Sequence, residues 1–293
     1  MSTPAYACRV ASRDVRVEAG RIITIAIAAG REIMAVASDP ESNWGATRKA
    51  DDSPLTLADL RANKVICDAL RADFPAVPIV SEEEESPSWE ERREYSHFWC
   101  VDPLDGTKEF IKRNGQFTVN IALCEVGAFG TAAPTAAPVL GVVHTPATGV
   151  THWAIKGLGA FRRESESAAD VPIAVAEFAI DDAGLIVVAS RSHLSPATEA
   201  FIATLNAPTM ESVGSSLKLL MVAEGKAHLY PRFAPTCEWD TAASHIIVDE
   251  AGGSVTQVGT GPAKEGERVE YNKEDKLNPF FLCEGRRTGG AVR

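Results

Sequence analysis

Hydrophobic residues in the first quarter of the chain follow the spacing of two α-helices. Apolar residues recur with a helical period over Val15–Ala37, and the Asp39-Pro40 pair would end this helix. A second helical pattern runs to Phe74 and begins at Thr56, whose spacing to Asp59 is that of a capping box. The pattern therefore predicts two early helices.

Short apolar runs after Phe74 predict a region rich in β-strands. The predicted strands cover residues 76–80, 97–101, 117–126, 139–145 and 149–155. Between them, the proline-containing segment Thr131–Pro138 reads as an exposed insertion without chemistry of its own.

From Gly184 onward, strand and helix patterns alternate. Strands are predicted over 185–190, 227–232 and 280–285, and helices over 198–205, 216–225 and 241–253. The change of pattern predicts two subdomains, residues 1–183 and 184–293, in a protein that contains both helices and sheets. The length of 293 residues, with 45% hydrophobic and 24% charged residues, is ordinary for a globular protein of this kind.

The charge and cysteine content narrow the possible functions. With 29 basic against 40 acidic residues and a net charge of -11, the chain should not be attracted generally to nucleic acid or anionic membranes. The six cysteines lack metal-binding spacing, which favours free thiols and a cytoplasmic location. The apolar stretch Ile22–Gly30 is too short to insert across a bilayer.

An apolar strand ends abruptly in two aspartates within "FWCVDPLDGTKEF". Asp102 stands at the strand end, Pro103 restricts the backbone, and Gly106 permits a tight turn, so Asp102 and Asp105 can converge on one point. A divalent cation such as Mg²⁺ would offset their repulsion. The alternative is an Asp-rich turn in which each carboxylate caps its own backbone.

Further acidic residues occupy comparable positions. Glu82 directly follows the predicted strand 76–80, Asp240 precedes a predicted helix where it could be an N-cap, and Asp51 with Asp52 precedes a Ser-Pro turn. Each has a structural interpretation: a solvated Glu run, a helix cap or turn chemistry. Together they predict a site with several carboxylates and more than one metal, as used in phosphoryl transfer.

These residues carry a resemblance to the inositol monophosphatase superfamily of metal-dependent phosphatases. Its EE, DPxDGT and WDxAA…EAGG motifs are matched in order by Glu82-Glu83, Asp102–Thr107 and Trp239–Gly253. Longer strings, such as "VDPLDGTKEFIKRNGQFTVNIAL" and "GSSLKLLMVAEGKAHLYPRF", resemble the 3′(2′),5′-bisphosphate nucleotidase branch. The resemblance implies a fructose-1,6-bisphosphatase-like fold of alternating helix and sheet layers.

The resemblance also implies roles for individual residues. Two or three Mg²⁺ ions would be bound by Glu82, Asp102, the Leu104 carbonyl, Asp105 and Asp240. The catalytic residues would be Glu82, Thr107 and Asp51, of which the first two position the attacking water. Substrate would be held by Gly106, Thr107, His193, Ser215, Lys218, Arg232 and Asp240. From the residues alone, Lys218 could instead lie on a solvated helix face, and His193 could be a capping or packing residue.

The expected activity is hydrolysis of the 3′-phosphate of adenosine 3′,5′-bisphosphate, and of its 5′-phosphosulfate counterpart, by an attacking water. The alternatives are inositol monophosphatase or fructose-1,6-bisphosphatase activity, or a non-catalytic Mg²⁺ or nucleotide sensor. The presence of both Glu82 and Thr107 speaks against the sensor. The expected partner is a small nucleotide rather than nucleic acid, and the chain is expected to be a monomer or a homodimer.

Overall fold

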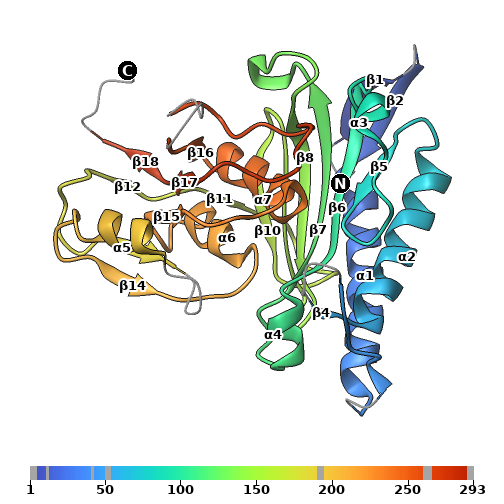
Figure 1. Cartoon of the computed structure of the whole chain (residues 1–293), viewed down its shortest axis with the longest axis horizontal. Helices are drawn as coiled ribbons and strands as arrows, with labels where there is room; N and C mark the ends of the chain where they lie inside the picture. The colour runs from blue at the N-terminus through green and yellow to red at the C-terminus, as the bar shows by residue number, and fades with distance from the viewer. Residues whose placement is uncertain are drawn as a thin grey trace.

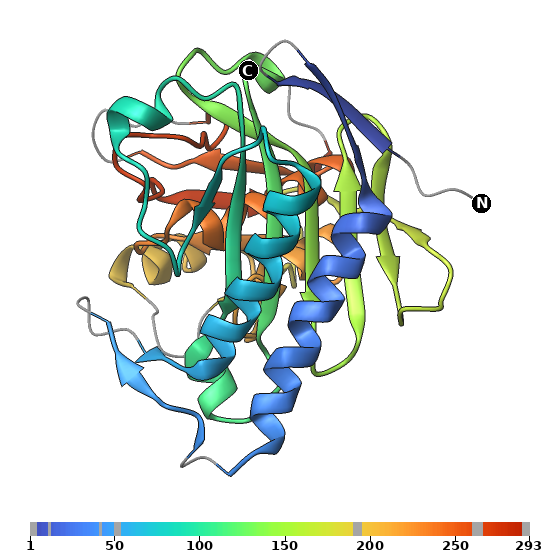
Figure 2. The same ribbon diagram turned by 90° about the vertical axis from the view of Figure 1, so that its right-hand side faces the viewer.

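A computed structural model describes residues 5–10, 13–40, 43–49, 54–189, 195–259 and 266–288. Its helices are α1 (Ala19–Ser38), α2 (Leu57–Asp73), α3 (Trp89–Arg92), α4 (Thr107–Ile111), α5 (Pro196–Ile202), α6 (Leu217–Ala223) and α7 (Glu238–Glu250), with a short 3-10 helix at Ala128–Gly130. Figures 1 and 2 show them arranged around two stacked sheets.

The larger sheet contains seven strands in the order β11-β10-β9-β8-β7-β6-β5. These strands are β5 (Ile79–Ser81), β6 (His97–Asp105), β7 (Thr118–Val126), β8 (Ala136–Thr145), β9 (Val150–Ile155), β10 (Gly159–Arg163) and β11 (Val171–Ile173). Only β5 and β6 run parallel to each other, so their C-terminal ends meet at one edge. The remaining neighbours in this sheet pair in antiparallel fashion.

The smaller sheet contains five strands in the order β14-β13-β15-β17-β16. These are β13 (Ile186–Val188), β14 (Thr209–Glu211), β15 (Leu229–Arg232), β16 (Ser254–Gln257) and β17 (Phe281–Glu284). Three two-stranded pairs complete the structure: β1 (Ala5–Val10) with β2 (Arg13–Glu18), β3 (Thr47–Arg48) with β4 (Pro54–Leu55), and β12 (Glu177–Phe178) with β18 (Arg286–Arg287).

Hydrophobic packing stacks these elements in alternating layers. One core lies between α1, α2 and the larger sheet, and a second lies between the opposite face of that sheet, α6, α7 and the smaller sheet. A third, smaller cluster joins β13, β15 and β17 to α5. The order helix, sheet, helix, sheet, helix is visible in Figure 1 and confirms the layered α/β fold predicted from the sequence. The division at residue 183 stays a prediction.

Several predicted elements differ in the structure. The first helix begins at Ala19, so its predicted start at Val15 is wrong, because Val15 and Val17 belong to β2 of an N-terminal hairpin. Strand β7 is buried on both faces through Cys124, because α1 and α7 cover opposite sides of the sheet. The predicted exposed loop at 131–138 is wrong for its last three residues, which begin the buried strand β8.

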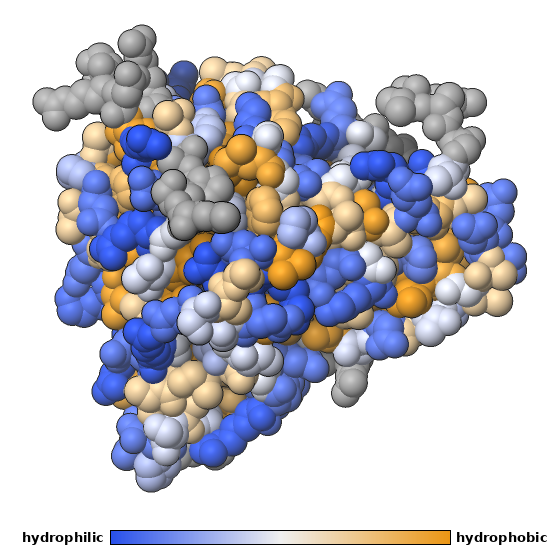
Figure 3. All heavy atoms as spheres, turned by 180° about the vertical axis from the view of Figure 1, so that it is seen from behind, coloured by the Kyte–Doolittle hydropathy of each residue, from blue (hydrophilic) through white to orange (hydrophobic). Residues whose placement is uncertain are grey.

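The outer surface mixes polar and apolar residues. On the face shown in Figure 3, hydrophobic side chains occur in small groups among hydrophilic ones. The large exposed hydrophobic residues, such as Leu60, Val171 and Met210, come from separate elements. In the described part of the chain, no helix combines the length and the hydropathy that a membrane crossing requires.

Helix α7 packs directly on strand β8 because Gly141 has no side chain. A Cβ atom at Gly141 would lie 2.3 Å from the Ala243 carbonyl oxygen and 2.5 Å from Ile246 Cγ2. The helix backbone therefore lies so close to the strand that no side chain fits at residue 141. This contact fixes the position of the helix that carries Asp240 in its first turn.

We predict that Gly141→Ala destabilises the protein by about 3 kcal/mol, because neither the helix backbone nor the strand can yield without disturbing the core. Gly157→Ala is the control: its Cβ would meet nothing within 4 Å, and its φ of +78° should cost about 1–2 kcal/mol. Urea unfolding measures both. Equal losses in the two variants would contradict the close contact.

Candidate active site

The C-terminal end of β6 carries two aspartates, Asp102 and Asp105. Asp102 is buried, and its Oδ1 accepts a hydrogen bond of 3.0 Å from the backbone N–H of Leu104. The strand pairing is irregular between Asp102 and Asp105, which lets both carboxylates leave the strand near its end. Gly106 follows with φ of +94° and starts α4. The strand therefore ends in an irregular pairing between the two aspartates, followed by a left-handed glycine.

Glu82 and Asp240 approach Asp102 from neighbouring elements. Glu82 follows β5, and its N–H donates to the Val101 carbonyl at 3.1 Å, so it lies beside the end of β6. Asp240 lies in the first turn of α7. One carboxylate oxygen from each of Glu82, Asp102 and Asp240 lies within 4.8 Å of the others. The structure therefore brings together three of the predicted carboxylates.

Asp240 differs from its predicted role as an N-cap. The N-cap residue of α7 is Cys237, and Asp240 is the third helical residue, whose Oδ2 accepts from the Cys237 N–H at 2.9 Å. The two positions form a capping box in which the carboxylate reaches back to the cap. Its other oxygen remains available to the acidic cluster. The predicted N-cap residue is therefore wrong, although the Asp240 carboxylate does lie in the first turn of the helix.

Crowding of buried carboxylates perturbs their ionisation. Burial raises the pKa of Asp102 well above its usual range, and the charges of Glu82, Asp105 and Asp240 raise it further. Burial and the Asp105 charge likewise raise the pKa of Asp240 to about 8. Carboxylates in such an arrangement need positive charge nearby if they are all to ionise. An oxygen-rich cluster of this kind fits a hard divalent cation such as Mg²⁺.

Lys49 supplies one such charge, although the sequence reasoning did not assign it. Its Nζ lies 2.6 Å from Glu82 Oε1 and 2.6 Å from Glu83 Oε1. Burial lowers the pKa of Lys49, but the two glutamates outweigh this effect and raise the pKa overall. Burial also raises the pKa of Glu83 to about 7. The only sequence signal was the position of Lys49 at the start of the acidic segment before α2.

Thr107, the first residue of α4, is bonded to Asp59 of α2. Its hydroxyl donates to Asp59 Oδ1 at 3.0 Å, while Asp59 Oδ2 accepts from the Thr56 N–H and hydroxyl at 2.7 and 2.6 Å. Asp59 was predicted only as a capping residue, and this capping box is confirmed. The structure adds that the same carboxylate orients Thr107. Asp51 and His193, two further predicted site residues, lie outside the described residues.

The turn before α6 reaches Asp105 from the opposite side. Ser215 Oγ donates to Asp105 Oδ2 at 2.7 Å, and the Ser216 N–H donates to the same oxygen at 2.6 Å. Lys218 Nζ donates to the Ser215 carbonyl at 2.6 Å. Lys218 is only 8% exposed, so the alternative of a solvated helix face is wrong. Burial lowers the pKa of its ammonium group to about 8.

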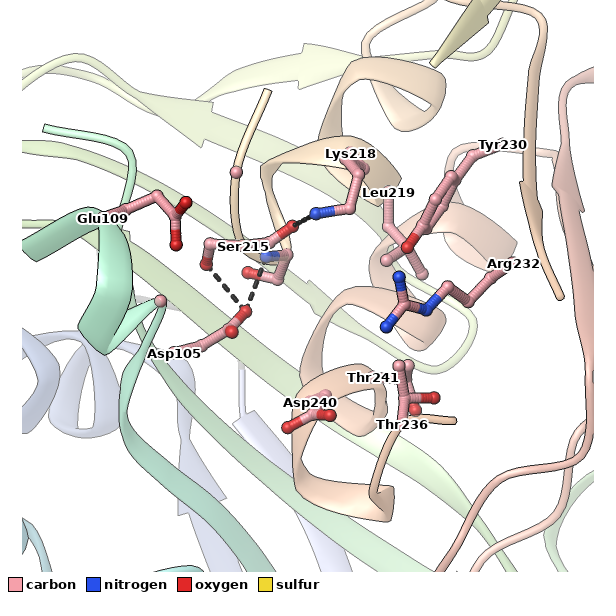
Figure 4. Close-up of a pocket in the computed structure, with 13 residues that line it drawn as sticks. Asp105, Glu109, Ser215, Lys218, Leu219, Tyr230, Arg232, Thr236, Asp240 and Thr241 are labelled. Atoms are coloured by element: carbon pink, nitrogen blue, oxygen red, sulfur yellow. Dashed lines mark hydrogen bonds between the residues drawn. The ribbon is translucent and has the colours of Figure 1, made fainter. Parts of the chain in front are cut away.

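These side chains surround one cavity (Figure 4). Its lining includes Asp105, Ser215, Lys218, Arg232 and Asp240 among the predicted residues. The lining also contains Gly106, and residues that were not predicted: Glu109, Tyr230, Thr236 and Thr241. Asp105 and Asp240 approach from separate elements, with Lys218 and Arg232 on the side of α6 and β15. The cavity therefore combines an acidic side with a basic side. Outside this lining, the carbonyl of the buried residue Leu104 lies 3.5 Å from Thr107 Oγ1.

Known proteins resemble this chain in both sequence and fold. The chain is 44% identical over 235 residues to the 3′(2′),5′-bisphosphate nucleotidase CysQ of Salmonella typhimurium, covering 80% of this chain and 86% of that protein. It is 41% identical over 262 residues to CysQ of Escherichia coli K12, covering 89% and 97%. The crystal structure of CysQ from Bacteroides thetaiotaomicron superimposes with a TM-score of 0.75 at 41% identity, covering 92% and 97%.

The solved structures also include an IMPase from Thermotoga maritima, with a TM-score of 0.65 at 25% identity and coverage of 90% of both chains. A family model described as the inositol monophosphatase family matches residues 16–282. This match spans the acidic cluster, Thr107 and the cavity described above. The chain belongs to the inositol monophosphatase family.

Proposed function

We propose that this enzyme hydrolyses the 3′-phosphate of adenosine 3′,5′-bisphosphate to give AMP and inorganic phosphate. The observation that carries the proposal is a cavity whose lining includes the carboxylates of Asp105 and Asp240 and two basic side chains, Lys218 and Arg232. Asp240 also belongs to the acidic cluster with Glu82 and Asp102, so the cavity adjoins that cluster. The relatives named as bisphosphate nucleotidases support the same substrate class. The sulfated nucleotide, adenosine 3′-phosphate 5′-phosphosulfate, is a second proposed substrate, acted on in the cytoplasm as a free small molecule.

Two or three Mg²⁺ ions are the proposed cofactors. Glu82, Asp102, Asp105, Asp240 and the Leu104 carbonyl would hold them. Three of these carboxylates form the acidic cluster, and Asp105 and Asp240 line the cavity. Bound Mg²⁺ would neutralise phosphate charge, lower the pKa of the attacking water and stabilise the leaving oxygen. The raised pKa values of Asp102 and Asp240 support this role, because these groups gain most from a nearby cation.

Thr107 and Glu82 are proposed to orient the attacking water. Because the Thr107 hydroxyl hydrogen is directed at Asp59, its oxygen lone pairs face outward as acceptors for a water hydrogen. Glu82 lies beside Asp102 and would accept the second hydrogen. Asp51 is the remaining proposed catalytic residue. The water oxygen would form a bond to phosphorus as the bond from phosphorus to the 3′ oxygen breaks, and that oxygen would leave protonated by a solvent proton.

The basic side of the cavity is proposed to hold the non-scissile phosphate. Lys218 and Arg232 provide two cations, and Arg232 is oriented by a hydrogen bond of 2.9 Å from its Nη2 to the Pro235 carbonyl. A guanidinium can form paired hydrogen bonds to phosphate oxygens, while the ammonium acts as a point charge. Gly106, Ser215, Asp240 and His193 complete the proposed substrate contacts. A substrate with a single phosphate would leave these cations without a partner.

The first prediction concerns substrate preference and Asp105. Phosphate release with Mg²⁺ should be far faster from adenosine 3′,5′-bisphosphate than from inositol 1-phosphate or fructose 1,6-bisphosphate, and a chelator should stop it. Asp105→Asn should lower kcat by about 100-fold or more, because a charged ligand is lost. Asp182→Asn, in an exposed turn where its carboxylate accepts from the Ala179 N–H, is the matched control and should retain activity.

The outcomes of this assay separate the alternatives. Preference for inositol 1-phosphate would preserve the metal site but reject the nucleotide assignment. No hydrolysis of any substrate would favour a non-catalytic sensor. Full activity of Asp105→Asn would show that Asp105 is not a ligand.

A second prediction tests the phosphate-binding role of Lys218. Lys218→Met should lower kcat/KM for adenosine 3′,5′-bisphosphate by about 10- to 100-fold, the value of a charged hydrogen bond. Adenosine 3′-monophosphate, which lacks the second phosphate, should lose less than about threefold by the same reasoning. Lys226→Met is the control, because Lys226 is an exposed lysine that pairs with Glu224. Equal losses for both substrates would reject the assignment of Lys218 to the non-scissile phosphate.

A third prediction follows from the raised pKa of Asp240. Because burial and the Asp105 charge raise the pKa of Asp240 from its ordinary value of 3.8 to about 8, the folded state keeps a proton that the unfolded state releases between these pH values. The contribution of Asp240 to the free energy of unfolding is therefore fully present below about pH 4, and it is lost as the pH rises through about 8. The Tm of the chelated protein should fall between pH 5 and 8, and Mg²⁺ should raise Tm more at pH 8.

Asp240→Asn is the control for this pH dependence, because the amide does not titrate. The variant should flatten the fall of Tm and reduce the effect of Mg²⁺. A Tm shift from Mg²⁺ that is equal at pH 5 and pH 8 would argue against ligation by the buried carboxylates.

A further inference from the structure

Two polar residues of β7 lie directly opposite the aspartates of β6. In the antiparallel register, Asn120 pairs with Asp102 and Thr118 pairs with Asp105. Thr118 is 0% exposed and Asn120 is 1% exposed, although the surrounding strand positions are hydrophobic. Polar groups are buried at this depth only where their hydrogen bonds are satisfied. Their partners therefore indicate what they are for.

The Thr118 hydroxyl belongs to a compact cluster of hydroxyl groups. Its Oγ1 lies 2.7 Å from Ser215 Oγ, 2.8 Å from Ser216 Oγ and 3.0 Å from Asn120 Oδ1. Ser216 Oγ lies 3.1 Å from Asn120 Oδ1. The cluster joins β7 of the larger sheet to the turn that starts α6. Two of its members, Ser215 and Ser216, also line the cavity.

The directions of the hydrogen bonds follow from the carboxylate. An ionised Asp105 can only accept, so the Ser215 hydroxyl must donate its single hydrogen to Asp105 Oδ2. The Ser215 oxygen can then only accept from Thr118, at 2.7 Å. The single hydrogen of the Ser216 hydroxyl has two acceptors within reach, Thr118 Oγ1 at 2.8 Å and Asn120 Oδ1 at 3.1 Å. The chain from Thr118 to Ser215 to Asp105 therefore runs in one direction and ends at the carboxylate.

The backbone of the serine turn is held in an unusual conformation. Ser215 has φ of +56°, which costs energy for any residue with a side chain. Gln116 Oε1, two residues before Thr118, accepts from the Gly214 N–H at 2.9 Å, and a Cβ at Gly214 would lie 3.0 Å from the Gln116 carbonyl oxygen. Gln116, just before β7, therefore contacts the turn at Gly214, and Thr118, the first residue of β7, contacts it at Ser215. These two contacts keep the Ser215 hydroxyl directed at Asp105.

We propose that Thr118 is a positioning residue that fixes the Asp105 carboxylate for cation binding through the hydroxyl of Ser215. The inference rests on the proposed function, in which Asp105 is a ligand. With Oδ2 engaged by Ser215 and by the Ser216 N–H, the remaining oxygen, Oδ1, has no hydrogen-bond donor among the described residues. The hydroxyl chain thus selects which oxygen faces the cation and removes rotational freedom from the ligand. Ser215, assigned above to substrate, acts here on Asp105.

The experiment measures cation binding without turnover. Mn²⁺, which prefers the same oxygen ligands as Mg²⁺, is titrated into wild-type and variant protein and its free fraction is followed by electron paramagnetic resonance. Thr118→Val keeps the shape of the side chain and removes the hydroxyl. We expect the Kd of at least one Mn²⁺ site to rise by about 10-fold or more, as for other groups that orient metal ligands. Thr118→Ser, which keeps the hydroxyl, should restore binding to near the wild-type value.

Two further variants separate positioning from stability. Thr151→Val removes another buried threonine hydroxyl, which bonds His144 Nδ1 at 2.9 Å elsewhere in the sheet, and should lower Tm without changing Mn²⁺ affinity. Ser215→Ala breaks the chain at its last link and should weaken Mn²⁺ binding even if Thr118→Val fails to fold. Unchanged Mn²⁺ affinity in Ser215→Ala or in folded Thr118→Val would overturn the proposal. Absence of Mn²⁺ binding by wild-type protein would instead reject the metal site itself.

Discussion

The mutual repulsion of buried carboxylates is the constraint on which the properties of this site depend. Glu82, Asp102 and Asp240 place oxygens within 4.8 Å of one another, and Asp105 adds its charge from the adjacent turn. In a low-dielectric interior such a cluster is stable only with protonation or with compensating cations. Lys49 compensates Glu82 and Glu83 directly, through contacts of 2.6 Å. The remaining unfavourable charge is the property through which the cluster would favour a divalent cation.

The layered fold creates this cluster by bringing three chain segments to one place. Parallel pairing of β5 and β6 sets Glu82 beside Asp102, and the close packing of α7 on Gly141 sets the position of the helix that carries Asp240. Both arrangements depend on the core rather than on the acidic residues, which oppose each other. Hydrophobic burial on the two faces of the larger sheet therefore supplies the free energy that holds the carboxylates together.

Local patterns predicted most of the helices and strands and the acidic motifs, whereas the layered arrangement was expected from the family resemblance. A strand ending in "DPLDGT" and a helix beginning near "WDTAA" place their carboxylates by backbone geometry alone. The sequence did not predict the contacts of Lys49 with Glu82, of Asp59 with Thr107 or of Thr118 with Ser215, since each joins segments far apart in the chain. The late start of α1 was missed because Val15 lies seven residues before Ile22, which is a helical spacing, whereas the alternation of Val15 and Val17 is the two-residue period of β2.

The separation of charge within the cavity has a further physical consequence. Asp105 and Asp240 lie toward one side and Lys218 with Arg232 toward the other. Burial lowers the pKa of Lys218 to about 8, the acidic groups oppose this effect, and Arg232 adds to it. A divalent cation would shield these carboxylates and weaken their attraction for Lys218, which frees the ammonium group to bind an anion. A bound phosphate would in turn favour the cation. By linkage each ligand must strengthen the other to the same extent, so the cavity favours joint binding of cation and phosphate over binding of either alone.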